Sequence, residues 1–318
     1  MLNELLKRRV LMILGKGGVG RTTISAALGL AASRGGARVC VIEYDNRAPL
    51  AAVLGIEPSY EPVEAAPGMS LIALEGARTL SEYLHIVMPS PAILRTVLSS
   101  RLYSYFVPAA PGLRELIMIG KLYHEIERRP ADLPPWDLVI FDGPASGQAL
   151  DLLRMPLTAD QIFGGSIVGR EARNVANFLR DRSRCAAVQV ATGDPLTVSE
   201  TIEFYGALAD IGMRPAAVIF NRKLTMPFGR AAIDRLARSI GDGNGAQRAP
   251  LIRRARRLAD AAARNDRARK TLRDQCGPLI EVEDQSAARG RALIEVLAAE
   301  FAQLMSQPES QTIERPRA

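Results

Sequence analysis

The sequence predicts an α/β fold, a doubly wound and mainly parallel sheet that carries a phosphate-binding loop and an inserted helical subdomain. Short apolar runs alternate with helical patterns along most of the 318 residues, which is the order of parallel β-α-β units. The runs at 10–14 and 37–43 are apolar at nearly every position, as in strands buried on both faces. A glycine-rich turn joins the first run to a helical pattern.

The composition is that of a globular protein, with 47% hydrophobic and 24% charged residues. The longest apolar runs, such as 10–14, are far shorter than the roughly 18–20 residues of a membrane span. Basic residues precede that run, but no small-residue cleavage site follows it. We therefore predict a cytoplasmic protein with one domain over 1–306 and a disordered polar tail over 307–318.

The three cysteines, Cys40, Cys185 and Cys276, are widely separated and form no C-x-x-C pair. Two histidines are too few to complete a structural zinc site with them. Cys40 lies inside a predicted strand, where we expect a small buried hydrophobic residue.

The first element after the strand at 10–14 is the glycine-rich stretch at 15–23, GKGGVGRTT, and an alanine-rich helical pattern follows at 24–32. Glycines allow consecutive backbone N–H groups to converge on one anion, and the helix directs the positive end of its dipole to the same point. A glycine turn that binds no phosphate is the alternative. The predicted phosphate-binding residues are Gly15, Lys16, Gly17, Gly18, Val19, Gly20, Arg21, Thr22 and Thr23, of which Thr22 would also place its hydroxyl on Mg²⁺.

This loop departs from the usual pattern G-x-x-x-x-G-K-[ST], because Arg21 stands where the lysine is expected. The loop does contain a lysine at another place, because Lys16 comes directly after the first glycine. Only five of the 41 basic residues are lysines, so a lysine at position 16 suggests that this side chain is needed there. Loops of this kind mark P-loop proteins that work as nucleotide-sandwiched dimers.

Two carboxylates follow predicted strands. Asp45 follows the strand at 37–43 and Asp142 follows the strand at 137–141, so both lie at the edge where open α/β sheets bind ligands. A turn or cap residue is the alternative for Asp45. Asp142 is the expected partner of Mg²⁺. We interpret the Gly/Pro-rich residues 143–148 as a switch loop that senses the γ-phosphate, the alternative being an ordinary turn.

The other elements follow from periodicity and turn residues. Helical patterns at about 79–130 and 226–274 are predicted insertions. We expect Pro156 to end one helix, and Thr197, with Glu200 three residues later, to cap another. Asn221 follows a strand and could pair with an adenine edge. The remaining strands are expected at 70–74, 137–141, 186–191, 215–220 and 278–282, and the remaining helices at 149–155, 166–179, 196–211 and 287–305.

The segment 226–274 is rich in arginine. A solvated helix face is the simpler interpretation, and an anionic membrane surface or an acidic partner is the alternative. No aromatic residues interleave these arginines, which argues against a nucleic-acid partner. The last residues, 312–318, lack the apolar face of a membrane anchor.

Three stretches in order, the loop at 15–23, Asp45, and DGPASGQALDLLRMP at 142–156, resemble the ArsA-type family of arsenite-pump and tail-anchored-protein-targeting ATPases. The resemblance implies a dimer that binds ATP and Mg²⁺. It implies that Lys16 contacts phosphate across the dimer interface, and that Asp45 orients the attacking water. It further assigns Thr22 and Asp142 to Mg²⁺, Thr23 to the α-phosphate, Gly147 to the switch and Asn221 to adenine.

The sequence also departs from the family. Arg21 replaces the loop lysine and Gln148 replaces a switch histidine, while the family's metal-binding cysteines are missing. The segment after Pro156 is shorter than in the targeting ATPases, so the protein client is unknown. We therefore expect an ATP-hydrolysing dimer that couples nucleotide state to a helical partner-binding surface. The alternative is a regulatory subunit with weak or no hydrolysis, in a heterodimer with an active paralogue.

Overall fold

The computed structural model describes residues 1–318 except 45–47, 88–111, 128–134, 240–244, 286 and 307–318. Its described strands form one eight-stranded sheet in the order β3-β4-β2-β5-β1-β6-β7-β8. All neighbouring pairs are parallel except β3 and β4. The strands are β1 (Val10–Gly15), β2 (Val39–Glu43), β3 (Val63–Ala66), β4 (Met69–Ala73), β5 (Leu138–Ala145), β6 (Cys185–Ala191), β7 (Ala217–Lys223) and β8 (Leu279–Glu283).

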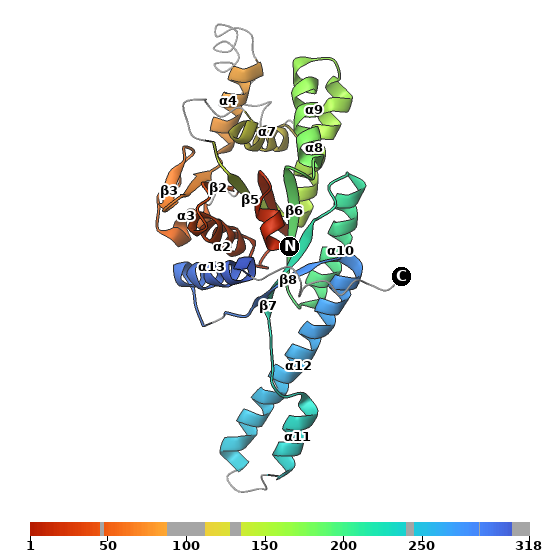
Figure 1. Cartoon of the computed structure of the whole chain (residues 1–318). Coiled ribbons are helices and arrows are strands. Elements are labelled where there is room, and N and C mark those ends of the chain that lie inside the picture. Colours follow the sequence, from red (N-terminus) through yellow and green to blue (C-terminus); the bar gives the residue numbers. More distant parts are fainter. Residues whose placement is uncertain (45–47, 88–111, 128–134, 240–244, 286, 307–318) are drawn as a thin grey trace.

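Helices cover both faces of this sheet, which confirms the predicted doubly wound α/β class (Figure 1). One face packs against α1, α2, α3 and α13, and the other against α7, α8, α9 and α10. The helices are α1 (Leu2–Leu6), α2 (Arg21–Arg34), α3 (Pro49–Leu54), α4 (Gly76–Val87), α7 (Leu113–Glu127), α8 (Ser146–Phe163), α9 (Ile167–Arg180), α10 (Pro195–Asp210), α11 (Arg230–Ser239), α12 (Gly245–Cys276) and α13 (Gly290–Ser306).

The central strand β1 divides its side chains between the two cores. Leu11 and Ile13 belong to the core under α2, and Met12 and Leu14 to the core under α8. Alternate side chains of a strand point to opposite faces, so a strand covered on both sides is apolar throughout. The pattern at 10–14 predicted this position. Cys40 is likewise buried in β2, as expected.

The sequence misplaced the boundary between β5 and α8. We expected a loop at 143–148, but β5 continues to Ala145 and α8 begins at Ser146. Pro156 does not end this helix, which runs on to Phe163. A proline removes one intrahelical hydrogen bond, and packing of the buried Pro156 and of its buried neighbour in the helix, Leu153, offsets that loss.

The cap of α10 was also assigned to the wrong residue. Asp194 is the N-cap and accepts a 3.1 Å hydrogen bond from the backbone N–H of Thr197. Thr197 is therefore inside the first turn. Aspartate ranks above threonine as an N-cap, and Pro195 directly after Asp194 is typical of the first position of a helix. The elements α1, α3 and β3 were missed because they have only five, six and four residues, too few for a periodic pattern to stand out.

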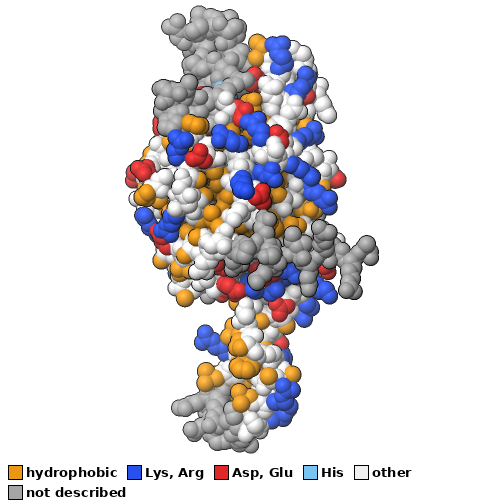
Figure 2. Space-filling model, viewed as in Figure 1, with side chains coloured by type: hydrophobic (Ala, Val, Ile, Leu, Met, Phe, Trp, Pro, Cys, Tyr) orange, Lys and Arg blue, Asp and Glu red, His pale blue; other side chains and the backbone are white. Residues whose placement is uncertain are grey.

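Helix α11 and the first part of α12 extend away from the sheet as an antiparallel pair, and the end of α12 packs against β7 and β8 (Figure 1). Arg256 pairs with Asp234 across the two helices at 2.7 Å, and Arg230 pairs with Asp260. Apolar side chains also lie on the surface of this pair (Figure 2). Leu236 of α11 is 59% exposed.

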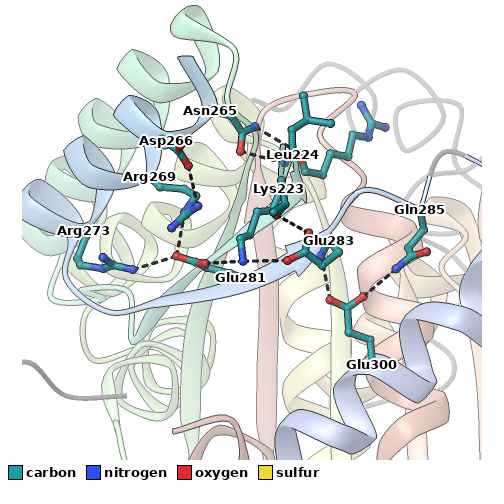
Figure 3. Close-up of polar contacts among 12 residues, drawn as sticks. Lys223, Leu224, Asn265, Asp266, Arg269, Arg273, Glu281, Glu283, Gln285 and Glu300 are labelled. Atoms are coloured by element: carbon teal, nitrogen blue, oxygen red, sulfur yellow. Dashed lines mark hydrogen bonds and ion pairs between the residues drawn. The ribbon is translucent and has the colours of Figure 1, made fainter. Parts of the chain in front are cut away.

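Figure 3 shows how α12 is attached to the sheet edge. Oε1 of Glu281 on β8 accepts hydrogen bonds from the guanidinium groups of Arg269 and Arg273 of α12, both at 2.9 Å. Lys223 at the end of β7 lies 3.3 Å from the same carboxylate and 2.8 Å from Glu283. Several arginines of the basic segment thus pair within the chain, which favours a structural use of this charge. Among the described residues, no helix combines the length and apolar character needed to cross a bilayer.

Candidate functional site

The glycine-rich loop between β1 and α2 has the backbone of an anion cradle. Gly15, Gly18 and Gly20 have φ values of 142°, 83° and 97°, which side-chain-bearing residues rarely adopt. Gly15 also lies so close to β6 that a Cβ atom would be 2.5 Å from the carbonyl oxygen of Val190. A Cβ added to Gly17 or Gly18 would meet nothing within 4 Å, so the loop faces open space on that side.

The helix after the loop begins at Arg21, with Gly20 as its N-cap. A glycine cannot cap the first-turn N–H groups with a side chain, so these donors and the positive dipole end remain suited to an anion. Thr22 and Thr23 lie in this first turn. The loop and helix therefore fit a phosphate group by their geometry.

Asp142 lies beneath the loop, near the end of β5. It is buried, at 5% exposure, and accepts hydrogen bonds from Thr22 Oγ1 at 2.7 Å and from Ser25 Oγ at 3.1 Å. A hydroxyl and a carboxylate oxygen are ligands that Mg²⁺ prefers, so the pair fits that ion. Ser25 was missed by the sequence analysis, although its position three residues after Thr22 places both on one face of α2.

Arg21 bridges the loop helix and β5. Its guanidinium donates to the backbone carbonyl of Gly143, the residue directly after Asp142. A guanidinium carries five N–H donors in a planar fork, so it can serve this carbonyl and a phosphate oxygen together. The structure therefore gives the arginine at this position a partner that the sequence did not suggest.

Lys16 forms an ion pair with Glu200 of α10, at 2.9 Å between Nζ and Oε2. The other oxygen of Glu200 accepts a hydrogen bond from the hydroxyl of Ser146, the first residue of α8. The hydrogen bonds from Ser146 and Lys16 lower the pKa of Glu200 below its ordinary value. We expected Glu200 only as part of a helix cap.

Asn221 of β7 supports the loop at Val19. Its Nδ2 donates a 2.8 Å hydrogen bond to the carbonyl of Val19, and its Oδ1 accepts one from the backbone N–H of Arg222 at 3.0 Å. The side chain is buried and lies against Gly20, where a Cβ would be 2.5 Å from Nδ2. In this structure Asn221 positions the loop, and the contact with adenine stays a prediction.

Asp45 lies outside the described residues. The strand before it, β2, ends at the edge of the sheet where Asp142 lies. Glu43 is the register partner of Asp142 across β2 and β5, so both strands end at the same edge. Glu43 is fully buried, and its carboxylate accepts a 2.5 Å hydrogen bond from the N–H of Leu50 at the start of α3. Gln148 in the first turn of α8 donates to the hydroxyl of Tyr44 at 3.1 Å, and Gly147 lies between Gln148 and Ser146.

The structure thus brings Lys16, Thr22 and Asp142 to one edge of the sheet, together with the glycine loop and Asn221. The model of the ArsA ATPase family, described as anion-transporting ATPase, matches residues 8–171, which is more than half of the chain. The chain belongs to this family. The resemblance drawn from the motifs at 15–23 and 142–156 is thereby confirmed.

Individual relatives support the same assignment. The chain is 26% identical over 223 residues to ATPase BagA of Mycobacterium tuberculosis, covering 68% of the chain and 65% of BagA. It is 26% identical over 247 residues to an arsenical pump-driving ATPase of Acidiphilium multivorum, and 25% identical over 247 residues to one of Escherichia coli. These last two alignments cover 72% of the chain but 42% of each relative, and the chain spans less than two thirds of BagA as well.

Proposed function

We propose that the chain binds ATP with Mg²⁺ and hydrolyses it, as a dimeric ArsA-type ATPase whose nucleotide state controls a helical partner-binding surface. The observation that carries this proposal is the contact between Thr22 and Asp142. These residues are 120 positions apart in the chain, yet Oγ1 of Thr22 lies 2.7 Å from Oδ2 of Asp142. The contact is under an open glycine loop at a helix N-terminus. No structural requirement of the fold calls for a hydroxyl, a buried carboxylate and an uncapped helix start at one point.

Each residue has a role in this proposal. The N–H groups at 15–23 bind phosphate oxygens, Thr23 meets the α-phosphate, and Thr22 and Asp142 hold the metal ion. Bound Mg²⁺ would balance charge on the phosphate oxygens. Lys16 supplies a cation to the transferred phosphoryl group across a dimer interface, and Asp45 orients the water for in-line attack.

The direct connection of β5 to α8 supports coupling to a distant surface. No residue separates Ala145, the end of β5, from Ser146, the start of α8, so a shift at Gly143 passes into the helix. The far end of α8 and the start of α9 expose Ile162, Phe163 and Ile167, which are 67%, 50% and 47% accessible. Exposed apolar side chains grouped in this way are typical of a protein-binding surface.

A protein partner fits this chain better than a metalloid. Cys40, Cys185 and Cys276 are the chain's three cysteines, and all are buried. Burial raises the pKa of Cys185 to about 12 and of Cys276 to about 11, so neither offers a thiolate near neutral pH. The names of the arsenical-pump relatives therefore give no guide to what this chain binds.

The test is the rate of ATP turnover in the presence of Mg²⁺, measured as the release of inorganic phosphate. Lys16→Ala and Asp45→Asn should each lower the rate by on the order of 10³, because a cation and a water-orienting group act mainly in the transition state. Wild-type turnover no faster than that of both variants would overturn hydrolysis as the function. Sedimentation with ATP and Mg²⁺ tests the dimer.

The contact of Arg21 favours a second candidate, the regulatory subunit of a heterodimer. Because the guanidinium donates to the Gly143 carbonyl, part of its binding capacity is directed to the protein instead of to phosphate. A larger planar cation also differs from the compact ammonium that usually meets the γ-phosphate. Such a subunit would bind nucleotide but turn it over slowly.

A further inference from the structure

Glu200 joins two parts of the candidate site through one carboxylate. Oε2 lies 2.9 Å from Nζ of Lys16 on the glycine loop, and Oε1 accepts the hydroxyl of Ser146 at the start of α8. The side chain of Glu200 thus contacts both Lys16 and the start of α8, the helix whose far end exposes Ile162 and Phe163.

The carboxylate is presented from a firmly held helix. Asp194 caps α10 through Thr197, and Thr201 donates a 2.7 Å hydrogen bond back to the carbonyl of Thr197. Phe204 and Leu208 of the same helix are buried in the core. A side chain on such an element keeps a defined position, so its contacts are a fixed feature of this conformation.

The electrostatics of the pair oppose phosphate binding. The side chains of Lys16 and Glu200 are 25% and 34% exposed, and the hydrogen bonds from Ser146 and Lys16 keep the pKa of Glu200 low enough for it to be ionised near neutral pH. A carboxylate at 2.9 Å neutralises the ammonium, and it repels an incoming phosphate at close range. Glu200 and a phosphoryl group therefore compete for the charge of Lys16.

We propose that Glu200 is a positioning residue that restrains Lys16 and the start of α8 together until nucleotide competes for the lysine. This rests on the proposed function, in which Lys16 contacts phosphate. When phosphate binds Lys16, Glu200 loses its counter-ion. The hydrogen bond from Ser146 to the same carboxylate is then altered as well. Ligand binding and movement of α8 are then linked through one group, since a ligand shifts a conformation only by binding one state better.

The first experiment measures the affinity for a non-hydrolysable ATP analogue with Mg²⁺ by calorimetry. Glu200→Gln removes the charge and keeps the shape, so it should tighten binding by about fivefold or more, and Glu200→Asp should lie nearer the wild type. Glu203→Gln is the matched control, because Glu203 is exposed on the same helix, and it should change affinity by less than twofold. In a Lys16→Ala background, Glu200→Gln should have no effect, because the two changes act on one pair. Unchanged or weaker binding in Glu200→Gln would overturn the proposal.

The second experiment needs no nucleotide. Amide hydrogen exchange of the free protein should become faster at 16–20 and at 146–150 in Glu200→Gln, but not in Glu203→Gln. Equal exchange in both variants would refute the restraint even if the ATPase function holds. Failure of the wild type to bind the analogue, with faster exchange in Glu200→Gln, would refute the proposed function and leave the restraint supported.

Discussion

The hydroxyl of Thr22 donates a 2.7 Å hydrogen bond to Oδ2 of Asp142, across the boundary between the loop helix and β5. The carboxylate is buried, and its other oxygen accepts the hydroxyl of Ser25. Two hydroxyls therefore hold the carboxylate in one orientation. This arrangement makes the site's dependence on Mg²⁺ the first property to measure.

Asp142→Asn should raise the Mg²⁺ concentration needed for half-maximal turnover by about 10–100-fold, because the amide removes the charge that holds the ion. The measurement is ATP turnover over a range of Mg²⁺ concentrations. Asp151→Asn, at an exposed position on α8, is the control. An unchanged Mg²⁺ requirement in Asp142→Asn would show that this carboxylate does not serve the metal.

Arg21→Lys separates the two functional proposals. If Arg21 limits catalysis, a compact ammonium should raise turnover by about tenfold or more, equivalent to some 1.4 kcal/mol of barrier. The control is Arg170→Lys, an exposed arginine on α9, which should leave the rate unchanged. Unchanged turnover in Arg21→Lys, in a chain active as a homodimer, would remove the case for a regulatory subunit.

Gly20→Ala should damage the loop through both backbone and side-chain contacts. The φ of 97° costs a residue with a Cβ about 1–2 kcal/mol, and the new methyl would lie 2.5 Å from Nδ2 of Asn221. We expect a lower free energy of unfolding in urea and weaker nucleotide binding. Gly17→Ala, where a Cβ meets no protein atom within 4 Å, should leave the free energy of unfolding unchanged. Equal effects of the two substitutions would contradict this account.

Tyr60 should make stability depend on pH in the alkaline range. Burial, and then its hydrogen bond to Glu82, raise the pKa of Tyr60 to about 12. Since the folded pKa exceeds the unfolded value of about 10, this contribution is full below pH 10 and is lost as the pH rises through 12. At pH 8, Tyr60→Phe should lower the free energy of unfolding by about 1 kcal/mol.

Urea denaturation of wild type and Tyr60→Phe between pH 8 and 12 measures this loss. The gap between the two proteins should shrink above pH 10. Comparing the pair cancels the titration of groups elsewhere in the chain, which both proteins share. A gap that stays constant over the whole range would mean that ionisation of Tyr60 does not affect stability.

Much of the site follows from local sequence. A phosphate loop is built from consecutive residues, so its glycines, hydroxyls and helix start are all visible in one stretch at 15–23. Asp142 could be added because parallel strands end at a common edge, and its neighbour across the sheet, Glu43, lies where that rule requires. These inferences need only periodicity and chain direction.

Other features depend on contacts that no local pattern records. The continuation of β5 into α8 without a loop, and the passage of that helix through Pro156, result from packing that outweighs local preferences. The partners of Arg21 and Lys16 come from Gly143 and Glu200, 122 and 184 residues further along the chain. Nothing in the sequence near the loop points to either one.

The sequence by itself therefore determined the fold class, the family and the phosphate loop, because each is encoded in the order of neighbouring residues. Only the tertiary structure decided which groups pair with the two basic side chains of that loop, Lys16 and Arg21, and how Asn221 supports the loop. The physical reason is that such pairs form between elements that meet only after the sheet and its helices have packed.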